Sequence, residues 1–160
     1  MREIKFRGFS KELNKWIYGN LIKTSNKFYI AKQEYLGIYE CFGIFVNILE
    51  FEEYENIFEV EPNSIGQYIG IKDKNDKEIY EGDIVSFILP KKFGIKQESY
   101  IGVIKYDSIV ASYKIYTYRN LDDFIHDYVY DYFYITDDVY IKVIGNVYEN
   151  PEFLRSNNAK

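Results

Sequence analysis

The chain has 160 residues, of which 47% are hydrophobic and 28% are charged, and its formal net charge is −5 at pH 7. This composition is typical of a globular protein with one sizeable core or two small ones, and it excludes a disordered chain. No apolar run approaches the roughly 20 residues that span a bilayer, and the charged start has no apolar signal-peptide core. Since a single cysteine, Cys41, cannot form an internal disulfide, we expect a cytoplasmic protein without a membrane partner.

The first part of the chain predicts short strands. Ile4, Phe6 and Gly8 alternate with Lys5, Arg7 and Phe9, which is the pattern of a half-buried strand. A polar turn over residues 10–15 then leads into a second strand, so the two form a hairpin. Residues 32–40 fit a loop or a short helix, and residues 42–51 fit either a buried strand or a helix. The strands expected here cover residues 4–9, 16–22, 28–31 and 57–60.

In the second part of the chain, the expected strands and turns are spaced as in a small barrel. A charged turn over residues 72–77 predicts a hairpin, and Glu81-Gly82-Asp83 is a turn that delivers the next strand. Gly102 is a predicted bend, which is typical of the coiled sheet of an SH3-like barrel. An acidic insertion near residues 119–138 fits a helical turn or a loop. The strands expected here cover residues 65–71, 78–80, 84–89, 100–106, 110–118 and 140–148, the last of which would close the barrel.

Three stretches carry a family resemblance: Met1–Phe9, Gly70–Val85 and Val143–Leu154. With these the chain resembles the YopX family of phage and prophage proteins, from Arg-Glu-Ile-Lys-Phe-Arg at its start to Val-Ile-Gly-Asn-Val-Tyr-Glu-Asn-Pro near its end. The family's central block corresponds to Gln67–Val85 here, and two residues depart from it, Ile69 in place of Thr and Asp76 in place of Gly. Because Asp tolerates a positive φ less well than Gly, we expect a slightly looser turn with the hairpin kept.

The patterns together predict a mostly β protein, all-β or β-rich α+β. An N-terminal β-rich part would cover residues 1–62. An SH3-like small barrel would cover residues 63–154, and residues 155–160 would form a flexible tail.

The residues offer little for catalysis or cofactor binding. His126 is the one histidine, and no Gly-x-Ser-x-Gly motif or nucleotide-binding loop is present, so we predict no enzyme and no cofactor. Glu78, Glu81 and Asp83 could gather around Mg²⁺ or Mn²⁺ in a metal-dependent hydrolase. Carboxylates that solvate a turn or bond its own amides are the favoured interpretation. Residues 73–76 lack the Gly and the distal Glu of an EF-hand calcium loop.

Aromatic and charged residues suggest two kinds of partner. The chain has 18 Tyr and 12 Phe, more rings than a small core buries, and exposed Tyr is common at interfaces. We therefore favour a protein-interaction module that self-associates or binds a host or phage protein. Its acidic stretch could also imitate nucleic-acid phosphates and inhibit a basic partner. The candidate partner-binding residues are Asp122, Asp123, Asp127, Tyr128, Tyr130 and Asp131.

The alternative is a nucleic-acid-binding module that uses the basic N-terminal hairpin. Residues 1–49 hold eight Lys or Arg and four acids, and Lys and Arg beside aromatic rings can hold phosphates and stack bases. The negative charge of the whole chain weighs against it. Alternation on a half-buried hairpin explains the same residues, with the rings inside and the charges in water. The candidates for nucleic-acid binding are Arg2, Lys5, Arg7 and Trp16.

Overall fold

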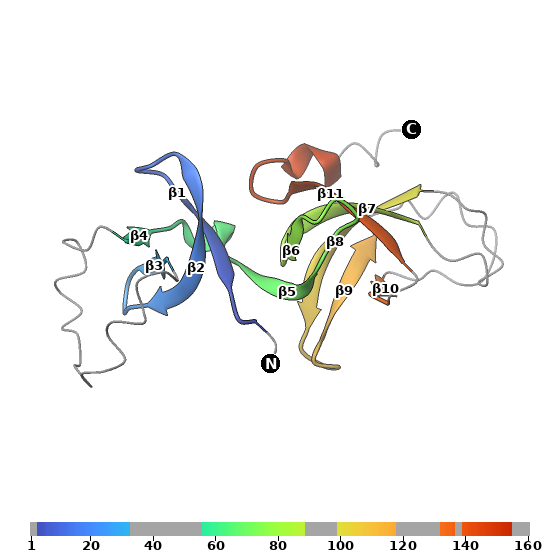
Figure 1. The fold of residues 1–160 in the computed structure, drawn as a ribbon, viewed down its shortest axis with the longest axis horizontal. Helices are drawn as coiled ribbons and strands as arrows, with labels where there is room; N and C mark the ends of the chain where they lie inside the picture. The colour runs from blue at the N-terminus through green and yellow to red at the C-terminus, as the bar shows by residue number, and fades with distance from the viewer. Residues whose placement is uncertain (1–2, 33–55, 89–98, 118–131, 137–138, 155–160) are drawn as a thin grey trace. The chain divides into compact units, whose positions relative to one another are not determined.

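The computed structural model describes residues 3–32, 56–88, 99–117, 132–136 and 139–154. They are mostly β, as predicted, with strands arranged in antiparallel sheets (Figure 1). No helix in these ranges is both long and apolar enough to cross a membrane. By its contacts the chain divides into two compact units, Met1–Tyr68 and Ile69–Lys160. The expected boundary after residue 62 stays a prediction.

The first unit is an antiparallel sheet in the order β4-β3-β2-β1, followed by the start of β5. Phe6 lies opposite Gly19 in the β1–β2 hairpin and opposite Gln67 of β5. Ile17, Ile30 and Val60 form its buried core, against which Phe6 packs partly buried. The elements are β1 (Phe6–Ser10), β2 (Lys15–Lys23), β3 (Phe28–Ala31), β4 (Ile57–Glu59), the 3₁₀ turn η3 (Pro62–Ser64) and β5 (Gly66–Lys72).

The second unit contains a five-stranded antiparallel sheet in the order β10-β9-β8-β7-β11. The end of β5 and β6 form the predicted hairpin, and Ile69 and Ile79 from it join the core of the sheet. That core also buries Val85, Phe87 and Ile104. The elements are β6 (Glu78–Tyr80), β7 (Asp83–Ile88), β8 (Ser99–Asp107), β9 (Ser112–Thr117), β10 (Tyr132–Tyr134), β11 (Tyr140–Asn146) and the 3₁₀ turn η6 (Pro151–Leu154).

A closed SH3-like barrel is not confirmed. The last strand, β11, pairs with β7, while β10 pairs with β9, so these two strands form the edges of an open sheet among the described strands. Strand β10 was not expected from the sequence, because its three residues lie inside the stretch assigned to an acidic insertion. The predictions for residues 32–40 and 42–51 lie almost wholly outside the described residues, as does the predicted tail.

Gly102 is required by close packing, which differs from its predicted role as a bend. It lies in the middle of β8 opposite Thr117 of β9, and a Cβ added there would lie 2.5 Å from Cγ2 of Ile115. The same Cβ would lie 2.7 Å from the backbone oxygen of Tyr116, which cannot move out of the way cheaply. Only glycine therefore allows β8 and β9 to approach this closely.

The stretch near the C-terminus owes its local shape to two asparagines. The backbone N–H groups of Tyr148 and Glu149 donate to Oδ1 of Asn146 at 3.0 and 2.9 Å. Asn150 accepts from the N–H of Asn146 at 3.3 Å, next to Gly145, where an added Cβ would lie 2.6 Å from its Oδ1. Side chains that bond nearby backbone in this way fix turns. The Gly-Asn-Val-Tyr-Glu-Asn sequence is thus explained by the turn that follows β11.

Candidate functional site

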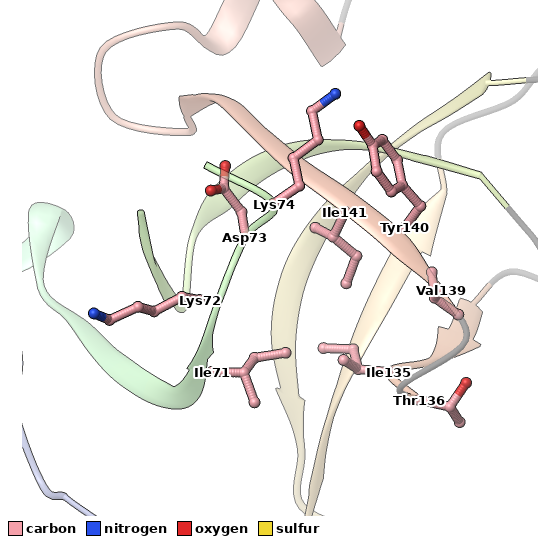
Figure 2. Close-up of a pocket in the computed structure, with 9 residues that line it drawn as sticks. All are labelled: Ile71, Lys72, Asp73, Lys74, Ile135, Thr136, Val139, Tyr140 and Ile141. Atoms are coloured by element: carbon pink, nitrogen blue, oxygen red, sulfur yellow. The ribbon is translucent and has the colours of Figure 1, made fainter. Parts of the chain in front are cut away.

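A pocket of about 460 Å³ lies in the second unit, between the β5–β6 hairpin and the segments next to β10 and β11 (Figure 2). Its volume is within the range of roughly 300–1,000 Å³ that is common for ligand-binding sites. Four of its lining residues come from the central block that carries the family resemblance. The lining residues are Ile71, Lys72, Asp73, Lys74, Ile135, Thr136, Val139, Tyr140 and Ile141.

The interior of the pocket is aliphatic. Figure 2 shows Ile71, Ile135 and Ile141 converging on its centre, while Lys72 and Lys74 extend outward. Ile71 is 41% exposed, so part of this aliphatic surface is in contact with water. At the rim, Nζ of Lys74 lies 4.3 Å from the centre of the Tyr140 ring, which is a cation–π distance. The arrangement suits an apolar group inside and an aromatic or anionic group at the rim.

Asp73 fixes one wall of the pocket. Its Oδ1 accepts hydrogen bonds from the backbone N–H groups of Asn75 and Lys77 at 2.7 and 3.0 Å. Its Oδ2 accepts from the N–H of Val143 in β11 at 3.0 Å, and the N–H of Lys74 donates to the Ile141 carbonyl at 3.2 Å. The turn is therefore tied to β11, and the pocket wall is formed before any ligand arrives. The predicted hairpin is confirmed, and Asp76 adopts the positive φ of 61° that its position demands.

These hydrogen bonds also set the ionisation of Asp73. Burial alone would raise the pKa of the carboxyl. The amides of Val143, Asn75 and Lys77 and the charge of Lys77 outweigh that effect and hold the pKa below its ordinary value of 3.8. Asp73 is thus an ionised structural acceptor at neutral pH.

A second polar feature of this unit is a buried lysine between tyrosines. Lys114 on β9 is 2% exposed, and its Nζ donates to Oδ2 of Asp107 at 2.6 Å. The same Nζ lies 3.6 Å from the ring centre of Tyr132 and 5.0 Å from that of Tyr134, both on β10. The ion pair and the cation–π contacts together hold the edge strand β10 on the sheet.

The ionised state of this pair is stable at neutral pH. Burial would lower the pKa of Lys114, but the hydrogen bond and the charge of Asp107, with the two tyrosines, raise it above its usual value. The hydrogen bond from Lys114, with one from the Ile109 amide, lowers the pKa of Asp107. Burial and the nearby Asp107 raise the pKa of Tyr116, whose hydroxyl donates to Asp107 at 3.3 Å. Lys114 is therefore a poor nucleophile or base, since it stays protonated.

Asp107 also fixes the tip of the β8–β9 hairpin. Its Oδ1 accepts from the N–H of Ile109 at 2.9 Å, while its Oδ2 bonds Lys114. The turn ends at Ala111, which has a positive φ of 52°. At this tip Ile109 is 92% exposed and Val110 is 47% exposed. The buried ion pair thus supports a shaped turn that presents two aliphatic side chains to water.

Each carboxylate considered for a metal site accepts a hydrogen bond from a protein group. Asp83 is buried and accepts from the N–H of Tyr80 at 2.8 Å, within its own turn. Glu78 accepts from the Tyr80 hydroxyl at 2.6 Å, and Glu81 accepts from the N–H of Tyr106 at 3.3 Å. Within the described ranges, no three His, Cys, Asp or Glu side chains group as a metal site. The structure does not bring these three carboxylates together.

The basic hairpin differs from expectation at Arg7. The charges of this hairpin were expected in water, but Arg7 is only 6% exposed, and its guanidinium carbon lies 4.9 Å from the centre of the Trp16 ring. Arg7 lies opposite Tyr18, which makes Trp16 its diagonal neighbour on the same face. The aromatic ring shields the cation and leaves little of it for a phosphate. Lys5 is half-buried, and Arg2 lies outside the described residues.

The acidic candidates Asp122, Asp123, Asp127 and Asp131, with Tyr128 and Tyr130, also lie outside the described residues, as do His126 and Cys41. The sequence reasoning missed the pocket and the pair of Asp107 and Lys114. The sequence does show a lysine, Lys114, within a Tyr-rich strand. It does not show the strand register that brings Lys114 to Asp107.

Comparison with known proteins gives one match to a family. The model of that family, described as YopX protein, matches residues 5–155. The chain is also similar to a solved structure, the crystal structure of protein EF1440 from Enterococcus faecalis, with 20% identity and a TM-score of 0.44 over 96% of this chain and 99% of that one. A similarity of this size supports no argument about fold or function. No curated protein matches the sequence. Since the family match covers nearly the whole chain, the chain belongs to the YopX family.

Proposed function

We propose that the protein is an accessory protein of a phage or prophage that acts in the host cytoplasm as a protein-interaction module. It would self-associate or bind a host or phage protein. The observation that carries the proposal is the placement of exposed large apolar side chains. Among the described residues, six exposed large apolar side chains belong to the second unit and three belong to the first. The six are Ile71, Tyr106, Ile109, Val110, Tyr134 and Tyr140.

The two edges of the open sheet support a binding role. Tyr134 on β10 is 54% exposed and Tyr140 next to the pocket is 48% exposed. Tyrosine is enriched at protein interfaces because its ring buries a large area while its hydroxyl stays hydrated. Edge strands also carry backbone groups that can pair with a strand from another chain. An acidic inhibitor would further use Asp122 to Asp138, and that version stays a prediction.

The test is affinity capture with the whole chain as bait, in lysate of a bacterium that carries a related prophage, beside measurement of the solution mass. We expect a defined complex, with itself or with a protein, that is weakened by the double substitution Tyr134→Ser and Tyr140→Ser. Tyr18→Ser is the matched control, because Tyr18 is 44% exposed but lies in the first unit. Equal binding by the double variant would contradict the proposal. A complex that disappears on nuclease treatment would favour the nucleic-acid alternative instead.

A further inference from the structure

The second unit carries two apolar features that are open to water. One is the aliphatic pocket around Ile71, Ile135 and Ile141. The other is the β8–β9 tip, here meaning Ile109 and Val110, on the hairpin that extends beyond the other strands of the sheet in Figure 1. We propose that the β8–β9 tip of one copy docks into the pocket of a second copy. The inference rests on the proposed interaction function and names the partner of this pocket.

Size and polarity of the two features agree. A cavity of roughly 150 Å³ already binds a benzene ring, so the pocket of about 460 Å³ has room for two branched aliphatic side chains. The carboxylate at the base of the tip, Asp107, is neutralised by its 2.6 Å bond to Lys114. The tip therefore brings no unpaired carboxylate from Asp107 into an apolar site, which would otherwise be costly.

Electrostatics at the rims also match. The pocket rim carries the cations Lys72 and Lys74, both on the exposed side of the hairpin. The base of the tip carries Tyr106 and Tyr113, whose ring centres lie 5.2 Å apart in an edge-to-face pair, with Tyr106 47% exposed. Ammonium groups are attracted to aromatic faces. Lys72 of one copy would thus meet the tyrosines at the base of the other copy's tip, beside Lys74, which contacts its own Tyr140.

The tip is held in shape before docking. Asp107 bonds the Ile109 amide through one oxygen and the buried Lys114 through the other. A loop that is already ordered loses less conformational entropy on binding. A tip and a pocket of this size bury less area than a standard interface, so the contact is weak and depends on concentration. The buried ion pair then has a role in binding as well as in the fold.

A mixing experiment tests the proposal with full-length chains. Ile109→Asp places a charge in the tip but keeps the pocket, and Ile71→Asp places a charge in the pocket but keeps the tip. We expect the wild-type mass in light scattering to rise with concentration, and each variant to associate at least about tenfold more weakly, because a charge enters an apolar contact. An equimolar mixture of the two variants should form a complex of two chains, since each supplies the part that the other lacks.

Ile4→Asp is the control, because Ile4 is 63% exposed but lies in the first unit, and it should associate as wild type does. Cooperative unfolding of every variant verifies that the fold is kept. The proposal is overturned if the wild type is a monomer at all concentrations, if the mixture stays monomeric, or if Ile4→Asp is equally weakened. A monomer that still captures a partner through Tyr134 and Tyr140 overturns self-docking and leaves the interaction function standing. A monomer without any partner overturns both.

Discussion

Asp73 shows how one residue of the central block shapes the site. Its two oxygens accept from three backbone amides, and one of these, on Val143, lies 70 positions away in the sequence. The carboxylate therefore connects the β5–β6 turn to β11 on the wall of the pocket. A bonded structural carboxylate of this kind explains the Asp-Lys-Asn sequence without a calcium site.

Replacing Asp73 with Ala should lower the free energy of unfolding by about 1–3 kcal/mol, because the buried amide of Val143 loses its acceptor. Urea denaturation of the purified chain measures this change. The exposed Glu152→Ala is the control and should change stability by less than about 0.5 kcal/mol. Equal stabilities of Asp73→Ala and the control would show that the turn is not tied to β11 in solution.

The same carboxylate predicts how stability depends on pH. The folded pKa of Asp73 lies below the ordinary value of 3.8, so its contribution is complete above that value and is lost as the pH falls through the folded pKa. Stability should thus decrease on acidification below about pH 4, and Asp73→Asn should show a smaller decrease than the wild type. Urea unfolding at a series of pH values measures both. If the free energy of unfolding of the two proteins changed equally with pH, Asp73 would not be the group responsible for the decrease.

At the scale of the elements, β10 is a short edge strand that depends on its neighbours. Among the described residues, Tyr132–Tyr134 pair with β9, and Phe133 packs partly buried against the core. Further attachment comes from the Tyr132 ring, which lies 5.9 Å from that of Tyr116, and from Lys114, whose ammonium group contacts both tyrosines of β10. An edge strand this short would otherwise fray readily.

Lys114→Met should loosen β10, because methionine keeps much of the aliphatic stem but loses the charge that contacts Asp107 and the tyrosines. We expect the amides of Tyr132–Tyr134 to exchange with solvent on the order of tenfold faster, while those of β7 change little. Hydrogen exchange followed by NMR measures this. Lys105→Met is the matched control, since Lys105 lies 5.6 Å from the Tyr116 ring but is exposed. Unchanged protection in Lys114→Met would contradict the account of β10.

Gly102→Ala tests the close approach of β8 and β9. The added methyl group would overlap Ile115 and the backbone of Tyr116, so the free energy of unfolding should fall by roughly 1–3 kcal/mol. Gly82→Ala is an informative comparison, because its φ of 81° strains an L residue although a Cβ there finds space at 3.4 Å. Thermal unfolding of both variants measures the two effects. A Gly102→Ala protein as stable as the wild type would show that the strands separate easily at this point.

Alternation of apolar and polar residues predicted most strands of both units, because strands with one buried face carry that period in the sequence. It failed for Tyr132–Tyr134, where three aromatic residues in an acidic stretch have no alternation to read. The prediction from alternation also had Arg7 exposed to water, because the pattern cannot show that Trp16 will cover the guanidinium. The pocket joins residues 71–74 to residues 135–141, and only the folded topology brings such distant segments together.

At the scale of the whole molecule, the second unit combines an open sheet, a preformed aliphatic pocket and an exposed aliphatic tip. A protein that worked alone would gain stability by covering such surface, since burying apolar area is favourable. Large exposed apolar surface is characteristic of interaction sites. The proposed binding to another chain would explain why these side chains stay exposed in the described part of the chain.

The most direct test of protein binding is sedimentation of the labelled chain, alone over a range of concentrations and then in nuclease-treated host lysate. The account predicts a species heavier than the 19.2 kDa monomer in at least one of these conditions. The double substitution Tyr134→Ser and Tyr140→Ser, or Ile109→Asp in the case of self-association, should reduce that species. A monomer in every condition, or a heavier species that needs intact nucleic acid, would contradict the account.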